Sequence, residues 1–546
     1  MKFSRLFLGA SLAMLLCPFT PRAQEPEQHK HDMGEKLGRV NFTVSCNTAA
    51  QQQFNRAVAL LHSFWYEEAE KGFVEVTKTD PKCGMGYWGI GMSFYHPVWT
   101  PPVVAELRNG SAALQEASVV GAQTQRERDY IAAIGAFFKD ADKLDHRTRA
   151  LAYEKAMEQL HLRYPKDDEA AVFYALALLG TALPTDKTYA NQKKAGEILN
   201  KVLLSEPEHP GVAHYLIHSF DYPALAPMAL AAARSYAKIA PSSPHALHMP
   251  SHIFTRLGLW QESIESNIAS AAAAKNYAAR MHPGAASFDQ LHAMDYLAYA
   301  YLQTAQDGKV KEIVDALYAI NKVDANTFSA AYAFAAIPAR YALERRQWSE
   351  AAALKVHPAD FPWNNFRYAE AMIYFTRSLG ASRSGDTASA SKDIEQLSSI
   401  QKSLAEGVEK YWATQVEIER RGAAAWLAHA EGKQEDALKL MRSAADLEGS
   451  TEKNPVTPGA IVPARELLGE LLLELREPQQ ALKEFEASLV VSPNRFNGLY
   501  GAAKAAELSG DREKAGIFYA KLTALGAPSD GTRPALQAAK VFLASK

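Results

Sequence analysis

Apolar and polar positions along the chain follow the spacing of amphipathic helices, and these helical stretches come in pairs. The clearest pair occupies residues 464–494, and a second pair with the same pattern follows at residues 495–522. Equivalent positions in the two pairs lie 34 residues apart, as in Gly469 and Ala503, Ala481 and Ala515, and Phe485 and Tyr519. An amphipathic pair cannot bury its apolar faces alone, so the pattern predicts that successive pairs stack and share a core.

The same register recurs upstream, in stretches such as HSFWYEEAEKGFVEVTKTDP, KKAGEILNKVLLSEP and AWLAHAEGKQEDALKLMRSA. With a small residue at position 8, alanine at 20, an aromatic residue at 24 and proline at 32, the motif resembles the tetratricopeptide repeat (TPR). The resemblance covers nearly all of residues 45–530. It implies an all-α fold, a TPR-type α-solenoid of antiparallel helix pairs. The first helix of each pair would line a concave groove that holds a small molecule, a peptide or a protein partner.

The N-terminus has the features of a secretory signal. Lys2 and Arg5 precede an apolar run from Leu6 to Leu16, which is shorter than the ~20 residues that span a bilayer. We therefore expect a bacterial-type exported protein, periplasmic or secreted, with no membrane span after signal cleavage. Cys17 offers a lipoprotein anchor as the alternative, but leucines precede it where a lipoprotein carries a small residue.

Interruptions of the repeat pattern divide the chain into six segments. We expect a signal peptide at 1–23, a flexible mature N-terminus at 24–44, N-terminal TPR-like repeats at 45–208, histidine-rich repeats at 209–325, degenerate repeats at 326–414 and C-terminal repeats at 415–546. The content of 48% hydrophobic and 22% charged residues is that of an ordinary globular protein. A net charge of −2 argues against a nucleic-acid-binding protein, which normally carries a basic face.

Two cysteines, Cys46 and Cys83, remain in the mature chain. A pair of cysteines in an exported protein is typical of one disulfide. The alternative is a pair of metal-binding thiolates, although neither cysteine has CxxC spacing. A disulfide would tie the lead-in of the first repeat to the start of the second.

Histidines are concentrated in one part of the chain. Half of the 16 fall within the 84 residues from His209 to His292. His214 and His248 lie 34 residues apart, as do His218 and His252, so an HxxxH pair recurs at the repeat period. Residues four apart share one face of a helix, and neighbouring helices pack ~8–10 Å apart. The pattern therefore predicts a metal site built from His214, His218, His248 and His252.

Further side chains on the same faces extend this site. Second-tier ligands or proton shuttles are expected at His245, Asp221, His292 and Asp295. Members of an outer groove are expected at His62, His96, His282 and Tyr299, with helix capping as the alternative for His62 and His96. Pro250 stands between His248 and His252, where it either begins a helix or kinks one.

Imidazole and carboxylate ligands suit a transition metal ion, namely copper, zinc or iron. The sequence then indicates metal-dependent binding or catalysis on a ligand in the groove, as a hydrolase or an oxidase. Three alternatives stay open: a non-enzymatic interaction scaffold in the cell envelope, metal storage or delivery, and a histidine-lined groove without metal. The chain has no GxSxG, P-loop or dinucleotide-binding motif that would point to another chemistry.

Overall fold

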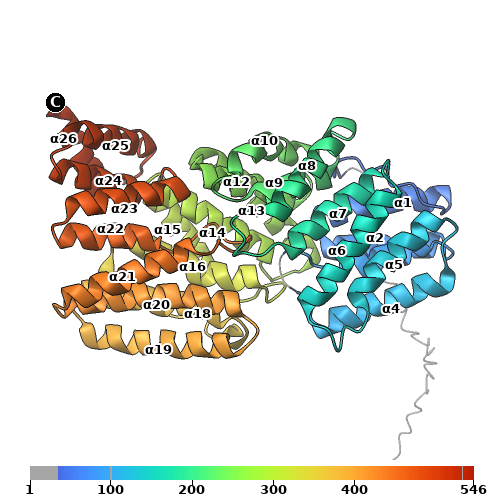
Figure 1. The fold of residues 1–546 in the computed structure, drawn as a ribbon, viewed down its shortest axis with the longest axis horizontal. Helices are drawn as coiled ribbons and strands as arrows, with labels where there is room; N and C mark the ends of the chain where they lie inside the picture. The colour runs from blue at the N-terminus through green and yellow to red at the C-terminus, as the bar shows by residue number, and fades with distance from the viewer. Residues whose placement is uncertain (1–34, 99–100, 532, 546) are drawn as a thin grey trace, which may run out of the picture. The chain divides into compact units, whose positions relative to one another are not determined.

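Helices form nearly all the regular structure (Figure 1). The computed structural model describes residues 35–98, 101–531 and 533–545, and Lys36–Lys546 form one compact unit. Within these ranges the β-structure is limited to an isolated parallel bridge between Ala286 and Val323. The predicted all-α fold is confirmed. The expected signal peptide at 1–23 and most of the segment 24–44 lie outside the described residues.

Helix boundaries follow the predicted succession of short helices. The first eight are α1 (Thr48–His62), α2 (Tyr66–Thr79), α3 (Gly84–Ser93), α4 (Val104–Val120), α5 (Gln125–Phe138), α6 (His146–Arg163), α7 (Asp168–Thr181) and α8 (Ala190–Ser205). The histidine-rich part and the repeat after it contain α9 (Pro210–Phe220), η1 (Ala226–Ala229), α10 (Leu230–Ile239), α11 (Pro244–His248), α12 (Pro250–Leu257), α13 (Trp260–Met281), α14 (Phe288–Gln303), α15 (Asp307–Tyr318) and α16 (Phe328–Glu344). The remainder contains α17 (Trp348–Ala352), η2 (Trp363–Asn365), α18 (Arg367–Arg383), α19 (Thr387–Glu406), α20 (Lys410–Ala430), α21 (Gln434–Gly449), α22 (Ala464–Glu474), α23 (Pro478–Val491), α24 (Phe496–Leu508), α25 (Arg512–Leu525) and α26 (Pro534–Ala544).

Small and aromatic residues of the repeat motif form the joints between helices. Each α-helix contacts the next one along the chain. In the C-terminal repeats, a Cβ atom at Gly469 would lie within 2.8 Å of the Phe485 ring, and one at Gly501 within 2.3 Å. Only glycine lets the neighbouring helices approach the ring this closely. The chain is thus an array of successive helices, each packed against the next.

The apolar interior consists of two clusters. One contains buried residues between Leu37 and Phe254, and the other contains buried residues between Trp260 and Phe542. The boundary falls between α12 and α13, inside the histidine-rich repeats. These repeats therefore join the two apolar clusters.

A segment that we call the cover segment, residues 450–463 between α21 and α22, packs onto the histidine-rich repeats. Lys453 Nζ donates to Asp221 Oδ2 at 2.7 Å. The Tyr296 hydroxyl donates to the carbonyl oxygen of Val456 at 3.2 Å. The histidine face, which the sequence predicts to line an open groove, is consequently buried.

The N-terminal disulfide is confirmed. Cys46, just before α1, is bonded to Cys83, the residue before α3, and their Cα atoms are 5.1 Å apart. The bond therefore fastens the first helix pair to the second. No helix in the described ranges is both long enough and apolar enough to cross a membrane.

Candidate metal centre

Six buried histidines from α9, α11, α12 and α14 gather into two groups of three. The first triad is His214, His218 and His245, and the second triad is His248, His252 and His292. Within each triad the candidate ligand atoms all lie within 4.8 Å of one another. No histidine of the six exposes more than 6% of its surface. The structure thus brings together the four histidines of the predicted site and two of its second-tier residues.

Pro250 divides the helical segment that carries the second HxxxH pair. α11 ends at His248 and α12 begins at Pro250, so of the two readings of this proline the helix start is the correct one. Proline suits the first position of a helix because its missing N–H group needs no partner there. Met249 between the two helices keeps helical dihedral angles (φ −52°, ψ −35°), so His248 and His252 still share a face.

The ring nitrogens that approach one another within the HxxxH pairs are all Nε2. The Nε2 atoms of His214 and His218 are 3.1 Å apart, and those of His248 and His252 are 3.0 Å apart. His245 Nε2 lies 3.1 Å from His214 Nε2. Two ligands bound at 2.0–2.1 Å in a tetrahedral site are separated by about 3.3 Å. The spacing is close to that of imidazoles around one metal ion in each triad.

Hydrogen bonds to Nδ1 determine which nitrogen of these rings carries the proton. His214 Nδ1 donates to the carbonyl oxygen of His62 at 2.6 Å. His248 Nδ1 donates to Asn267 Oδ1 at 2.7 Å, and Asn267 is oriented by its own Nδ2 bond to the Ser263 carbonyl at 2.7 Å. A carbonyl or amide oxygen can only accept, so both Nδ1 atoms carry hydrogen and both Nε2 atoms present lone pairs.

Burial of the triad histidines favours their neutral form. Burial lowers the pKa of His214 to about 3, and it lowers the pKa of His218, His245, His248 and His292 well below the ordinary value of 6.5. Neutral imidazole is the form that binds metal. His248 Nε2, which presents a lone pair, is only 3.0 Å from the Nε2 of His252. A cation between the two nitrogens would relieve the repulsion of lone pairs at this distance.

The two triads lie next to each other. The ring centroids of His218 and His252, which belong to different triads, are 6.2 Å apart, and those of His245 and His248 are also 6.2 Å apart. The aromatic rings of Phe64 and Tyr296 border the triads, with Phe64 4.4 Å from the His214 ring and Tyr296 4.7 Å from the His248 ring. The two adjacent triads therefore present three imidazoles each.

Neither predicted carboxylate belongs to a histidine triad. Asp221 accepts from Arg256 Nε at 2.9 Å and from Lys453 Nζ, and it lies 3.1 Å from His252 Nδ1. It therefore orients His252 from behind, as a carboxylate behind a metal-bound histidine commonly does. Asp295 is paired with the buried Arg340. Both carboxylates are thus paired with buried cations and neither belongs to a triad, and their predicted role as second-tier ligands or proton shuttles stays a prediction.

The residues expected in an outer groove do not join the triads. His282 Nε2 lies 3.4 Å from Glu67, and His96 Nε2 lies 3.2 Å from the Ser93 carbonyl oxygen. The Tyr299 hydroxyl accepts from Arg495 Nη1 at 2.8 Å. His62 is buried at the last position of α1 in a separate cluster.

That separate cluster, the His–Glu–His cluster, consists of His62, Glu169 and His209. Glu169 accepts from His62 Nε2 at 2.9 Å and from His209 Nε2 at 3.0 Å. His209 Nδ1 accepts the backbone N–H of Val212 at 3.3 Å, so its proton is on Nε2 and no lone pair faces the carboxylate. Burial alone would raise the pKa of Glu169, but the two histidines hold it well below 4.5. The cluster is a satisfied hydrogen-bond network.

Four residues around the triads were missed by sequence reasoning: Asn267, Tyr296, Arg256 and Lys453. Tyr296 and Arg256 carry a usable signal, because each lies four residues after a triad histidine on the same helix, His292 on α14 and His252 on α12. Asn267 and Lys453 reach the site from separate elements, and Lys453 is 232 residues from its partner Asp221. Their side chains nonetheless determine the orientation of the ligands.

Comparison with known proteins gives structural likeness and no sequence match. No model of a protein family matches the chain, and no curated protein matches it. Among solved structures it is similar to "Human IFIT1 dimer with m7Gppp-AAAA" (13% identity, 78% of this chain and 87% of the other, TM-score 0.37). It is also similar to "Crystal structure of APC/C hetero-tetramer Cut9-Hcn1" (12% identity, 91% and 83%, TM-score 0.35). A third is "Crystal Structure of the Yeast Tom70" (11% identity, 91% and 95%, TM-score 0.32).

Proposed function

We propose that the chain is a metalloprotein that binds two transition-metal ions, one in each histidine triad, and that copper is the preferred ion. The observation that carries the proposal is the set of Nε2 atoms 3.0–3.1 Å apart, in rings whose Nδ1 protons are held at His214 and His248 by oxygen acceptors. A buried, neutral, all-imidazole donor set favours copper over harder ions, and copper heads the general order of divalent affinities.

Three protein ligands leave a coordination position open on each ion, which is the arrangement of catalytic sites and not of structural ones. With copper, the pair supplies electron transfer to or from a small ligand that reaches the open positions. Both nearby carboxylates, Asp221 and Asp295, lie outside the triads and are paired with cations, which disfavours either one as a general base for hydrolysis. We therefore favour an oxidase over a hydrolase, with metal storage as the remaining alternative.

A peptide-binding scaffold is a weaker reading of this face. An extended peptide would have to displace the cover segment, including the buried contacts of Lys453 with Asp221 and of Arg340 with the Gly459 carbonyl. The charged side chains left behind would then lack partners, which costs several kcal/mol. Export to the periplasm stays part of the proposal and is supported by the Cys46–Cys83 disulfide, since such bonds persist in oxidising compartments.

The test is elemental analysis of the exported chain, purified without a histidine tag or chelator and also after reconstitution with copper, zinc or iron. We expect two equivalents of copper per chain. His248→Ala/His252→Ala removes two of three ligands of the second triad and should lose one equivalent or both. His96→Ala/His282→Ala changes two histidines outside the triads and is the matched control. Absence of metal after reconstitution, or equal metal in both variants, would refute the proposal.

A further inference from the structure

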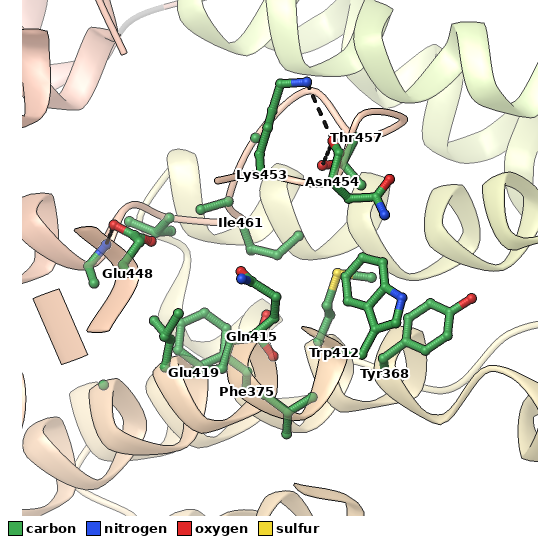
Figure 2. A pocket seen from close by; sticks show the side chains of 18 of the residues that line it. Tyr368, Phe375, Trp412, Gln415, Glu419, Glu448, Lys453, Asn454, Thr457 and Ile461 are labelled. Carbon is green, nitrogen blue, oxygen red and sulfur yellow. Dashed lines mark hydrogen bonds between the residues drawn. The ribbon is translucent and has the colours of Figure 1, made fainter. Parts of the chain in front are cut away.

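A second buried site lies beside the cover segment, between α18, α20 and α21 (Figure 2). It is a cavity of about 60 Å³. Figure 2 shows Gln415 and Glu419 of α20 on one side of the space and Asn454 and Thr457 of the cover segment on the other. Since a single water needs about 10–15 Å³ by this measure, the cavity accommodates roughly four non-hydrogen atoms.

Two polar groups of this cavity lack partners. Glu419 Oε2 and Gln415 Nε2 are buried and form no hydrogen bond with any described residue. Glu448, which also lines the cavity, accepts one bond, from the backbone N–H of Ala464 at 2.9 Å. Buried polar atoms are almost always hydrogen-bonded, and an exception at a cavity points to a missing ligand.

The cavity also contains two carboxyl groups that have no charged partner in the part of the chain that the structure describes. Burial, and then the nearby Glu448, raises the pKa of Glu419 to about 8. Burial raises the pKa of Glu448 to about 7. Neither carboxyl forms an ion pair with a described residue, and the one lysine of the lining, Lys453, is paired with Asp221. A cation in the cavity would remove the penalty of ionising both groups.

Aromatic rings complete the lining. Tyr368 and Trp412 are stacked, with ring centroids 4.4 Å apart and an interplanar angle of 14°. Both rings line the cavity together with Phe375. Trp412 also packs against Phe328, with ring centroids 5.3 Å apart, so this wall of the cavity is apolar.

We propose that this cavity binds a short primary alkylammonium ion between the Glu419 and Glu448 carboxyl groups, against the aromatic wall of Tyr368 and Trp412. A primary ammonium has three N–H donors and no acceptor. Glu419 Oε2, a Glu448 oxygen and the Gln415 amide, rotated to present its oxygen, supply three acceptors. Ethylammonium has three non-hydrogen atoms and fits the volume. The proposal does not depend on metal in the triads.

Isothermal titration calorimetry of the full chain with ethylammonium tests this site, with neutral ethanol as the control ligand. We expect binding of ethylammonium only. Because both carboxyl groups must ionise, binding at pH 7 should release protons, seen as an enthalpy that changes with the ionisation enthalpy of the buffer. Absence of ethylammonium binding at millimolar concentration, or equal binding of ethanol, would overturn the proposal.

Variants separate the proposed contacts from general effects. Glu419→Gln and Glu448→Gln keep the shape of the side chain and should each weaken ethylammonium binding about tenfold or more. Glu435→Gln on the exposed face of α21 is the matched control and should bind as the unaltered chain does. Unchanged binding in both cavity variants would refute the site. Each variant is checked by circular dichroism and metal analysis; if one of the two misfolds, the other decides.

Discussion

Two neighbouring groups of buried histidines differ in where their protons lie. In the triads, acceptors such as the His62 carbonyl and Asn267 hold the proton on Nδ1, so Nε2 lone pairs face one another. In the His–Glu–His cluster, the backbone N–H of Val212 occupies His209 Nδ1, so the proton faces Glu169. The same residue type therefore presents nitrogen lone pairs in one place and forms a satisfied hydrogen-bond network in the other.

The two groups share one residue. His62 belongs to the His–Glu–His cluster through its ring, and its backbone carbonyl accepts from His214 Nδ1 in the first triad. Close packing fixes this position, because a Cβ atom at Gly211 would lie 2.6 Å from His62 Nδ1. The His–Glu–His cluster thus adjoins the first triad through the backbone carbonyl of His62.

The largest expected difference between the triads and the His–Glu–His cluster is the effect of their mutation on metal content. His218→Ala/His245→Ala removes two of three ligands of the first triad and should lose one metal equivalent. His62→Ala/His209→Ala removes as many buried rings from the His–Glu–His cluster but keeps the backbone carbonyl of residue 62, so both equivalents should stay. Elemental analysis of the two variants side by side measures this. If both variants lost metal while remaining folded, the proposal that only the triads bind metal would be wrong.

The Glu169→Gln substitution should have the next largest effect. It should lower the stability of the fold and leave metal content unchanged. The amide offers one oxygen and one NH₂ group to two Nε2–H donors, so one donor loses its acceptor and the free energy of unfolding falls by about 3 kcal/mol. Urea unfolding measures the loss. Metal content should not change, and a loss of metal without a loss of stability would contradict the assignment.

The pH dependence of the same variant has a defined sign. The pKa of Glu169 is held well below 4.5 in the folded chain. Its contribution to stability is therefore fully present above about pH 4.5 and is lost as the pH falls below that value. The gap between the unaltered chain and Glu169→Gln should narrow on acidification. A gap that widens instead would mean that the carboxyl group is protonated in the fold.

The sequence predicted the helix pairs and the grouping of the six triad histidines because both depend on periodicity. Ala481 and Ala515, or His214 and His248, share a register that places them on equivalent faces, and local rules suffice for that. The Cys46–Cys83 bond was likewise predictable from cysteine count and export. These features need no knowledge of which distant segments meet.

The partners of Asp221 and Asp295 could not be predicted from the same patterns. Both lie on the expected face, but Lys453 and Arg340 reach them from 232 and 45 residues away. Periodicity gives the direction of a side chain and not its partner. The burial of the whole site under the cover segment has the same origin, since residues 450–463 lie in a connection with no repeat register.

Asn267→Ala should weaken metal binding without removing a ligand. Asn267 Oδ1 is the acceptor that holds the Nδ1 proton of His248, and loss of such a contact typically lowers metal affinity about 10- to 100-fold. Competition with a chelator of known affinity measures the change. Asn267→Asp keeps an acceptor and should restore most of the affinity. Equal affinity in the alanine variant and the unaltered chain would show that this contact does not orient the ligand.

The smallest expected effect is that of Tyr215→Phe. This variant tests whether the His–Glu–His cluster and the triads act independently. The Tyr215 hydroxyl lies 3.0 Å from His62 Nδ1; since burial raises the pKa of this phenol well above 10, the hydroxyl keeps its proton and donates. Removing it should cost about 1 kcal/mol of unfolding free energy and leave metal affinity unchanged. Tyr215 directly follows the ligand His214, so a metal effect here would be the most sensitive sign of coupling. If affinity fell tenfold or more while stability did not change, the His–Glu–His cluster would have to be counted as part of the metal centre.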